Sequence, residues 1–494
     1  MRTTRTHRFA AFAAVGLIAA ACSGGGDITD SGEKPDTVAS TAPGETLAPT
    51  TTVAPDLLPD CPTDALASAE GTVEIEFWHG MSSVLAEELT KLTDAYNASQ
   101  SKVKVTLSGE SYEITIDNYL QASEDSRPDL VQLPEYMVQS IVDTESTVPV
   151  SKCIEASGFD TSAFLPTALT AYSTQGVQWG MPFNVSNPVL YFNKNAFIAA
   201  GLDPNKPPQS LAELREYSQK IVDSGAAKYG LALDSGFDSG GGWYVEQWFA
   251  QAEEYYTDGD NGRTNRATQV LYNNDTGVDL LTFIQTMIND GLAVSVGDNA
   301  GGTDDLLKIA DEKEPAAMTI HTSAALSGAL DLLKSGIFPQ LGADDLGIGR
   351  MPGPDGKPGA LIGGASLWPV NSGDPVKIAA AWDFITYLVN AANQSEWAAT
   401  TGYIPVRTDA LTVEPYKSLL ATDARFSVAY DQLKASPDAL TSAGPVVGPL
   451  RQIRAVLATA VAKVFGGADV KGALDEAATQ ANNLIADYNR SNSG

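Results

Sequence analysis

The side chains that most often carry catalysis or bind metals are scarce in this chain of 494 residues. It has three histidines, His7, His79 and His321, and it lacks any His-x-x-x-His or Cys-x-x-Cys pair. Such pairs place two ligands close together, as a zinc site requires. The chain also lacks a Gly-x-Ser-x-Gly nucleophile turn and a Gly-x-x-x-x-Gly-Lys phosphate loop. The sequence therefore predicts no metal site, no cofactor and no catalytic residue.

One acidic segment has the outline of a calcium loop, Asp258-Gly259-Asp260-Asn261-Gly262. Its glycine falls one position early for an EF-hand, and the twelfth position is Gln269, where a bidentate glutamate is needed. A solvated acidic turn is therefore favoured over a calcium site. Surface carboxylates are plentiful, but nothing singles out a pair for glycosidase chemistry.

Aromatic and polar side chains gather instead in a few segments that lie next to glycine or proline. These segments are 77–80, 182–194, 318–323, 361–368, 401–406 and 452–454. Within them, Trp78 and His79 are expected to be cleft-wall or packing residues, and His321 a hinge or core histidine. The remaining residues of these segments are the candidates for a binding site.

The elements that must position these segments alternate between strands and helices. Alternation at period two marks the strands, and helical spacing of apolar residues marks the helices. The predicted strands are 73–78, 102–107 and 129–133, and the predicted helices include 376–390, 453–465 and 473–488. Ser210 and Glu213 have the spacing of a capping box, which predicts a helix start. This alternation predicts an α/β fold over mainly parallel sheets.

The first 22 residues have the pattern of an export signal. Arg2 and Arg5 precede an apolar segment, 9–21, that ends in small residues before Cys22. A cysteine at this place resembles the lipobox of bacterial lipoproteins, although Ala19 stands where leucine is usual. Residues 1–22 are therefore predicted to be a lipoprotein signal peptide with Cys22 as the lipidated residue. Ordinary cleavage nearby, with Cys22 incidental, is the alternative.

The composition after Cys22 separates a linker from a folded body. Residues 23–59 are rich in Ser, Thr, Gly and Pro and nearly free of large apolar side chains, which predicts a flexible linker. No later stretch approaches the roughly 20 apolar residues of a spanning helix. About 430 residues remain, enough for two domains of ordinary size.

The net charge and the cysteines restrict the partners and the compartment. A net charge of −30 argues against nucleic acids and anionic membrane surfaces, since both need clustered Lys and Arg. An anionic small molecule stays possible, because one well-placed arginine is enough to bind it. Cys61 and Cys153 are the two cysteines after Cys22. Outside the cytoplasm such a pair is typical of a disulfide, and two free buried thiols are the alternative.

The order and spacing of the aromatic and polar segments resemble the extracytoplasmic solute-binding proteins of ABC importers, and most closely the members that bind glycerol 3-phosphate. The resemblance runs from about Val73 to the C-terminus. It implies a two-lobed, type II periplasmic-binding-protein fold like that of maltose-binding protein, without enzymatic activity. The implied first lobe is 60–183 with 322–366, the second is 190–318 with 369–490, and the crossings lie near 184–189, 321 and 367–368.

The resemblance also implies a set of residues that contact the solute. They are Tyr112, Glu135, Ser186, Trp243, Thr322, Gly364, Tyr403 and Arg454. Glu135 would accept hydrogen bonds from glycerol hydroxyls, and Tyr403 and Arg454 would clamp a phosphate, because a planar guanidinium binds two oxygens at once. Gly364 would allow its backbone amide to approach an anion. The alternatives are a tight turn or core packing for Gly364 and Tyr403, and a surface ion pair for Arg454.

The chain departs from the family pattern at one wall of the expected site. Gly240 aligns with the first tryptophan of a Trp-x-x-Trp wall, and Trp243 aligns with the second. Loss of an indole predicts extra space beside the glycerol. A bulkier head group, such as that of glycerophosphocholine, is therefore expected to fit, with its choline over the face of Trp243.

These observations predict a monomeric substrate-binding lipoprotein of an ABC importer, held outside the cell membrane through Cys22. It would capture glycerol 3-phosphate or a glycerophosphodiester between its lobes and deliver it to the permease subunits. The alternative is a sugar- or oligosaccharide-binding protein of the same fold. A more remote alternative is a secreted phosphodiesterase, which the scarcity of histidine disfavours.

Overall fold

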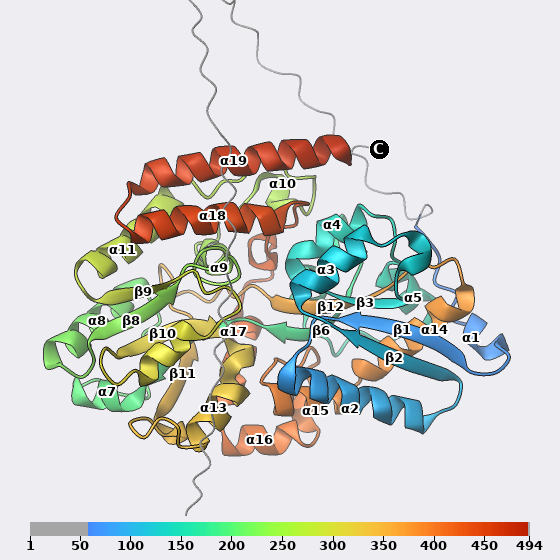
Figure 1. The fold of residues 1–494 in the computed structure, drawn as a ribbon, viewed down its shortest axis with the longest axis horizontal. Helices are drawn as coiled ribbons and strands as arrows, with labels where there is room; N and C mark the ends of the chain where they lie inside the picture. The colour runs from blue at the N-terminus through green and yellow to red at the C-terminus, as the bar shows by residue number, and fades with distance from the viewer. Residues whose placement is uncertain (1–57, 493–494) are drawn as a thin grey trace, which may run out of the picture. The chain divides into compact units, whose positions relative to one another are not determined.

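Two five-stranded sheets organise residues 58–492, the part of the chain that the computed structural model describes (Figure 1). The predicted signal peptide, Cys22 and nearly all of the predicted linker lie outside these residues. Among the helices of 58–492, none combines the length and apolar character needed to cross a membrane.

The first sheet has the strand order β2-β1-β3-β12-β6. Its strands are β1 (Val73–His79), β2 (Val103–Gly109), β3 (Leu130–Pro134), β6 (Met181–Ser186) and β12 (Gly363–Pro369). β1 pairs in parallel with β2 and β3, whereas β12 is antiparallel to β3 and β6. In β1 the side chains of Ile75, Phe77 and His79 alternate into the core, as the period-two pattern predicts.

The second sheet has the strand order β11-β7-β10-β8-β9. Its strands are β7 (Pro188–Asn193), β8 (Tyr229–Asp234), β9 (Ala293–Gly297), β10 (Ala316–Thr322) and β11 (Leu346–Arg350). β8 pairs in parallel with β9 and β10, and β7 is antiparallel to β10 and β11. β10 is buried over almost its whole length, as expected for a strand covered on both faces.

Each sheet and the helices that pack around it form a lobe. The first lobe includes α1 (Ala65–Ser68), α2 (Ser83–Ser99), α3 (Tyr112–Gln121), α4 (Val138–Val142), α5 (Val150–Ser157), α6 (Pro166–Ala171), α14 (Pro375–Leu388) and α15 (Ala391–Thr401). The second lobe includes α7 (Lys194–Ala199), α8 (Leu211–Ser224), α9 (Trp243–Gln251), α11 (Asp275–Asn289), α12 (Asp304–Leu307), α13 (Leu326–Lys334), α17 (Val428–Ala435), α18 (Leu450–Phe465) and α19 (Val470–Ser491).

The locally predicted helices form close to their expected ends. α8 begins with the predicted capping box: Ser210 accepts from the amide of Glu213 at 3.1 Å, and the Glu213 carboxylate accepts from the amide of Ser210. α14, predicted as 376–390, buries Ile378, Trp382, Ile385 and Leu388 at helical spacing. In both helices the sequence signal lies within the helix itself, so it does not depend on contacts with distant parts of the chain.

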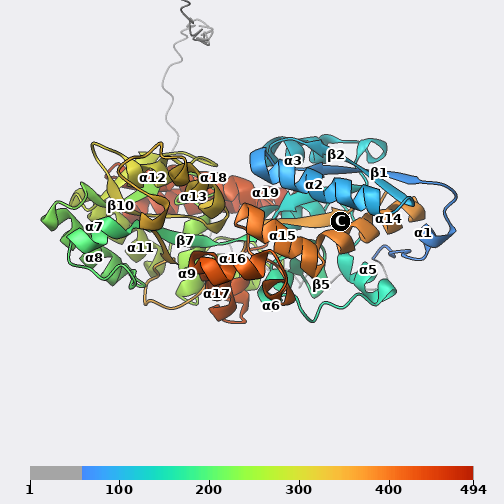
Figure 2. The same cartoon turned by 90° about the horizontal axis from the view of Figure 1, so that it is seen from below.

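The division of the chain between the lobes differs from the expected boundaries. The chain enters the second sheet between β6 and β7, inside the predicted crossing at 184–189. The crossing predicted at 321 is wrong, because β10 and β11 both pair with β7 and keep the chain in the second lobe. The crossing at 367–368 is also wrong, since β12 lies inside the first sheet and α14 packs on it (Figure 2).

The glycine content of β11 explains why the boundary at 321 was misplaced. β11 contains Gly347 and Gly349, and glycine weakens the apolar alternation by which an edge strand could be recognised. Because β10 and β11 both pair with β7, segment 322–350 belongs to the second lobe rather than the first. The helices α14 and α15, within 375–401, belong to the first lobe rather than the second.

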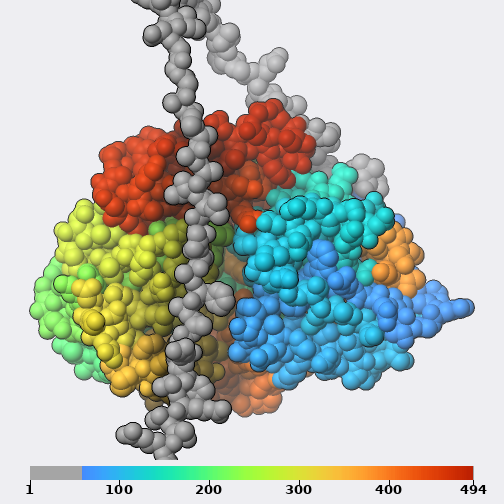
Figure 3. All heavy atoms as spheres, viewed as in Figure 1, coloured from blue at the N-terminus to red at the C-terminus, as the bar shows by residue number. Residues whose placement is uncertain are grey.

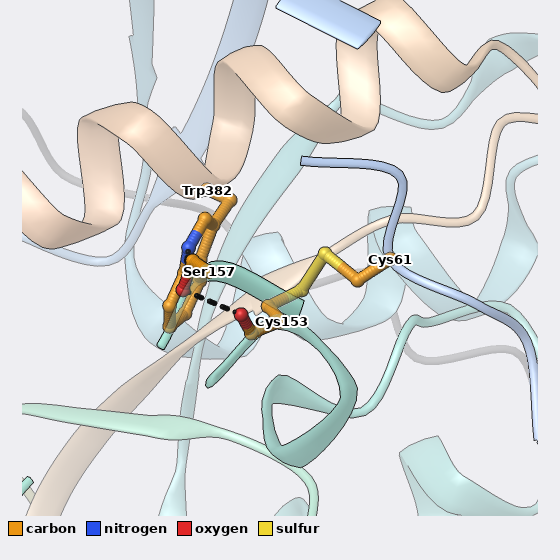
Figure 4. Close-up of a disulfide and its surroundings, with 4 residues drawn as sticks. All are labelled: Cys61, Cys153, Ser157 and Trp382. Carbon is orange, nitrogen blue, oxygen red and sulfur yellow. Dashed lines mark hydrogen bonds between the residues drawn. A yellow bond between two sulfur atoms is a disulfide. The ribbon is translucent and has the colours of Figure 1, made fainter. Parts of the chain in front are cut away.

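The predicted disulfide is confirmed: Cys61 and Cys153 are bonded, with their Cα atoms 4.9 Å apart (Figure 4). Cys61 precedes α1, and Cys153 lies on α5. The next turn of α5 is fixed against α14, where the Trp382 indole donates to the Ser157 hydroxyl at 3.2 Å. The bond thus ties the start of the described chain to the first lobe.

The acidic segment at 258–262 is a tight turn. The Asp258 carboxylate accepts from the amides of Thr268 and Gln269, and the Asn261 side chain accepts from the amides of Tyr256 and Thr257. Within 58–492, no group of three or more His, Cys, Asp or Glu side chains is placed to hold a metal ion. The acidic side chains of this segment therefore serve the turn itself.

Candidate functional site

Glu135, Arg454 and Glu246 meet at the boundary between the lobes. Glu135 follows β3 directly in the first lobe, while Arg454 lies in α18 and Glu246 in α9 of the second lobe. Nε and Nη2 of Arg454 each donate to one carboxylate oxygen of Glu246 at 2.7 Å, and Nη1 donates to Oε1 of Glu135 at 2.9 Å. One guanidinium therefore joins carboxylates from both lobes.

Burial controls the protonation of this cluster. The side chains of Arg454, Glu246 and Glu135 are 2%, 1% and 14% exposed. Burial raises the pKa of Glu135 to about 7, although Arg454 acts in the opposite direction. Burial opposes the charge of Arg454, but the two carboxylates outweigh it and raise the pKa of Arg454 above its ordinary value. Arg454 thus stays charged, and Glu135 can exchange a proton near neutral pH.

A second buried arginine lies beside this cluster. Arg263 donates to backbone carbonyls of the first-lobe segment 170–173 and of the second-lobe segment 443–444. Among residues 58–492 its guanidinium bonds to these carbonyls alone, and burial lowers its pKa to about 9. Arg263 therefore adds a positive charge to the site and connects the lobes through their backbones.

The four charged side chains line one small cavity. Glu135, Glu246, Arg263 and Arg454 line it together with residues of 361–362 and 443–445, and its volume is about 10 Å³. That is roughly the space of one water molecule. A larger solute therefore requires the lobes to separate before it can enter.

Tyr112 and Tyr403 belong to a polar network next to this cluster. The Tyr112 hydroxyl accepts from Nδ2 of Asn184 at 2.9 Å, and Oδ1 of Asn184 accepts from the amide of Gln132 at 2.7 Å. Burial raises the pKa of Tyr403, while hydrogen bonding to Asn184 and Tyr112 acts in the opposite direction. Tyr172 is also fully buried here, and its hydroxyl has no hydrogen-bond partner among the described residues.

Gly363 and Trp243 bring the two lobes into close contact, whereas Gly364 packs closely within the first sheet. Gly364 has φ +93°, and a Cβ there would lie 1.9 Å from the carbonyl oxygen of Asn184. At Gly363 a Cβ would lie 2.3 Å from the indole ring of Trp243. Trp243 thus reaches from α9 to the start of β12. Its buried Nε1 has no hydrogen-bond partner within 58–492.

Ser186 and Thr322, two of the implied contact residues, end strands in different lobes. Ser186 closes β6, is buried, and pairs in register with Gly363. Thr322 closes β10, and its hydroxyl accepts from the amide of Ala324 at 3.3 Å. In the described part of the chain, no hydrogen bond joins Thr322 to the other candidate residues. The structure thus groups Glu135 with Arg454, and groups Tyr112, Tyr403, Gly364, Ser186 and Trp243 around the adjoining strand ends.

The expected space at Gly240 does not exist. A Cβ at Gly240 would lie 2.0 Å from the carbonyl oxygen of Asp234, and one at Gly241 would lie 2.0 Å from that of Ser235. These glycines let the loop before α9 fold tightly on itself. The argument that a missing indole leaves room for a larger head group is therefore wrong.

The sequence interpretation missed Glu246, Arg263 and Tyr172. Glu246 is the one acidic residue of α9, all of whose residues are buried. A charge in an otherwise buried helix needs a partner, so this position carried a usable signal. Arg263 and Tyr172 lie in segments without such a signal.

Comparisons with known proteins identify the family. Residues 91–423 match the family described as bacterial extracellular solute-binding protein. The sn-glycerol-3-phosphate-binding periplasmic protein UgpB of Pectobacterium atrosepticum is 28% identical over 438 residues, which cover 86% of this chain and 94% of the relative. The UgpB of Escherichia coli K12 is 27% identical over 440 residues, with 86% and 95% covered.

Solved structures with the same fold bind different solutes. UgpB of Mycobacterium tuberculosis in complex with glycerophosphocholine has a TM-score of 0.67 at 21% identity, covering 85% of this chain and 99% of its own. The cyclic α-maltosyl-1,6-maltose binding protein of Arthrobacter globiformis has a TM-score of 0.67 at 22% identity, covering 84% and 99%. The two-lobed α/β fold is thus shared, and the chain belongs to the bacterial extracellular solute-binding proteins of ABC importers.

Proposed function

We propose that the solute of this ABC-importer binding protein is a glycerol-based phosphate ester, either glycerol 3-phosphate or a glycerophosphodiester such as glycerophosphocholine. The solute would bind where the lobes meet and would then be delivered to permease subunits in the membrane. The protein would act as a monomer and would bind its solute without chemical change.

The observation that carries this proposal is Arg454, a buried and charged side chain that faces Glu135 of the opposite lobe. A phosphate oxygen can replace Glu135 at Nη1 of Arg454, because both are anionic acceptors for the same N–H. Oε2 of Glu135 accepts no hydrogen bond from another residue of 58–492, so it is available to a glycerol hydroxyl. One site can therefore bind both ends of a glycerol phosphate.

Several neighbouring groups support the proposal. The Tyr172 hydroxyl and the Trp243 indole N–H are buried without partners among the described residues, and a polar solute would satisfy them. The UgpB relatives support a glycerol phosphate, but their identity of 27–28% leaves the solute a proposal.

Calorimetric titration tests the proposal. The chain from Ser23 onward, which lacks the proposed lipid attachment, is titrated with glycerol 3-phosphate, glycerophosphocholine and maltose. We expect binding of at least one phosphate ester, and loss of this binding in Arg454→Ala. Arg215→Ala is the matched control, because Arg215 forms an exposed ion pair with Asp290 inside the second lobe. Binding of maltose alone would overturn the proposed solute.

A sugar or oligosaccharide is the second candidate, and one observation favours it. Two nitrogens of Arg454 are already held by Glu246, and carboxylates beside aromatic rings suit neutral hydroxyl groups equally well. The same titration, repeated in the presence of inorganic phosphate, separates the candidates. Inorganic phosphate should compete with a phosphate ester but not with a neutral sugar.

We propose that the protein is anchored outside the cell membrane by a lipid on Cys22. The support is the sequence pattern of residues 1–22, which lie outside the described structure. Intact-mass analysis of the membrane fraction tests it. A Cys22→Ala variant should lose the lipid mass and leave the membrane.

A further inference from the structure

Glu246 occupies one edge of the Arg454 guanidinium, so no solute can bind to the N–H groups of that edge. Its two oxygens take Nε and Nη2 of Arg454 at 2.7 Å each, so one side of the guanidinium is closed by the protein itself. The Glu246 side chain is 1% exposed and lies in the first turn of α9, where the helix dipole favours a negative charge. The pair is therefore a permanent part of the second lobe.

The charges around the cavity can be counted. Its charged lining residues within 58–492 are two arginines, Arg263 and Arg454, and two glutamates, Glu135 and Glu246. With Glu135 ionised the four charges sum to zero, and with Glu135 protonated they sum to +1. A solute with one negative charge can thus be balanced when Glu135 takes up a proton. A second negative charge on the solute would have no positive charge among the lining residues to balance it.

We propose that Glu246 is a specificity-determining residue that limits the solute to one negative charge on its phosphate, so the site selects a phosphodiester over a phosphomonoester. This inference rests on the proposed function. Glu246 acts through Arg454, because both of its carboxylate oxygens accept hydrogen bonds from that side chain. In its absence, Arg454 would offer its full charge and its second pair of N–H donors.

The groups that surround Glu135 support this division of roles. Arg454 acts on Glu135 from α18 and Glu246 acts on it from α9, and of these two side chains only Arg454 favours the ionised form of Glu135. When a phosphate oxygen binds Nη1 of Arg454, the ionised form of Glu135 loses its hydrogen bond to Arg454. The pKa of Glu135 then rises, so Glu135 holds its proton more tightly. Glu135 is thus the exchangeable partner of Arg454, and Glu246 is the fixed one.

The experiment compares solutes that differ in charge. At pH 7.5 glycerol 3-phosphate is mostly doubly charged, because the second pKa of a phosphomonoester is about 6. Glycerophosphoglycerol carries one negative charge, and glycerophosphocholine adds a positive charge to the same diester. Calorimetry with all three separates the number of phosphate charges from any contact with choline. The protein is again the chain from Ser23 onward.

For the wild type we expect the diesters to bind about 10- to 100-fold more tightly than glycerol 3-phosphate, the effect of one uncompensated charge in an environment of intermediate dielectric constant. Glu246→Gln should bring this ratio to within about threefold by strengthening the binding of glycerol 3-phosphate. Glu253→Gln, which removes an exposed carboxylate just beyond α9, should keep the wild-type ratio.

A measurement on the wild type alone guards against misfolding of the variant. At pH 5.5 glycerol 3-phosphate is mostly singly charged, so the ratio should shrink without any substitution. An unchanged ratio in folded Glu246→Gln, or a wild-type ratio that is equal at both pH values, overturns the role of Glu246 while the proposed function stands. Failure of every phosphate ester to bind the wild type overturns the proposed function itself.

Discussion

Removal of the Arg454 side chain would leave the charges of Glu246 and Glu135 buried without a partner. Its guanidinium is the only side-chain partner of both Glu246 and Glu135 in the described part of the chain. Breaking a buried ion pair on one side is costly, because the remaining charge stays buried without compensation. At the scale of single residues, the site is therefore also a source of fold stability.

The first prediction concerns this coupling. Arg454→Met, which keeps the length of the side chain but not its charge, should lower the free energy of unfolding by about 3–5 kcal/mol at pH 7.5. The double variant Arg454→Met with Glu246→Leu should recover much of this loss, because an apolar pair replaces the ion pair. Urea denaturation measures both. Equal stability of the single and double variants would contradict the prediction.

The second prediction concerns pH and Glu135. The pKa of this carboxyl rises from 4.5 to about 7 on folding. The folded chain therefore binds more protons than the unfolded chain between these values, so the free energy of unfolding falls as the pH rises through this window. The full effect is about 3 kcal/mol at most.

The measurement compares urea denaturation of the wild type and Glu135→Gln from pH 4.5 to 7.5. His79 changes stability in the opposite direction, because burial lowers its pKa to about 4. Both proteins contain His79, so its contribution cancels in the difference. Parallel stability curves for the two proteins would show that Glu135 does not titrate in this range.

Only part of this site could be predicted from the sequence. Glu135 and Arg454 were both candidate ligand residues, but their contact spans 319 positions in the chain and no local pattern encodes it. Glu246 was missed because only Trp243 of this segment was considered as a site residue. At Gly240 the sequence suggested a lost side chain, whereas the structure requires a glycine for close backbone packing.

At the scale of elements, local signals were reliable and strand pairing was not. The capping box of α8 and the inward face of α14 depend on residues within one helix, so they could be predicted. The places of β11 and β12 depend on partners far along the chain, β7 for one and β3 and β6 for the other. Lobe boundaries inferred from the order of motifs were therefore displaced.

The third prediction concerns the disulfide, which joins two elements that are 92 positions apart. Replacing both Cys61 and Cys153 by serine should lower the free energy of unfolding by about 4 kcal/mol, since a closed loop of this length restricts the unfolded chain. Thermal unfolding measures the change. Adding a reductant should shift the wild type by a similar amount and leave the variant unchanged. Equal melting temperatures of the oxidised wild type and the variant would contradict the prediction.

At the scale of the whole molecule, the lobes are joined by more than the site. Asp143 of the first lobe pairs with Arg266 at 2.6 Å and accepts from the Tyr488 hydroxyl of α19 at 2.8 Å. Arg451 of α18 pairs with Glu113 and Asp117 of α3. These contacts lie where α18 and α19 meet α3 and α4 (Figure 3). They stabilise the arrangement in which Arg454 and Glu135 touch.

The fourth prediction follows from the pairs of Arg451. Its side chain is 28% exposed, so its pairs with Glu113 and Asp117 contribute at most about 1 kcal/mol, or a factor of about five in the equilibrium between separated and joined lobes. Arg451→Ala should therefore weaken solute binding by up to about fivefold without touching the solute, because fewer molecules have the lobes joined.

Small-angle X-ray scattering with calorimetry tests this prediction. The solute-free variant should have a larger radius of gyration than the wild type, and saturation with solute should remove the difference. Arg215→Ala, whose ion pair lies inside the second lobe, should behave as the wild type does. A larger radius that persists at saturation would point to misfolding. Unchanged affinity together with an unchanged radius would show that the Arg451 pairs do not control how the lobes close, which would leave the contacts of Arg454, Arg263 and Asp143 as the determinants.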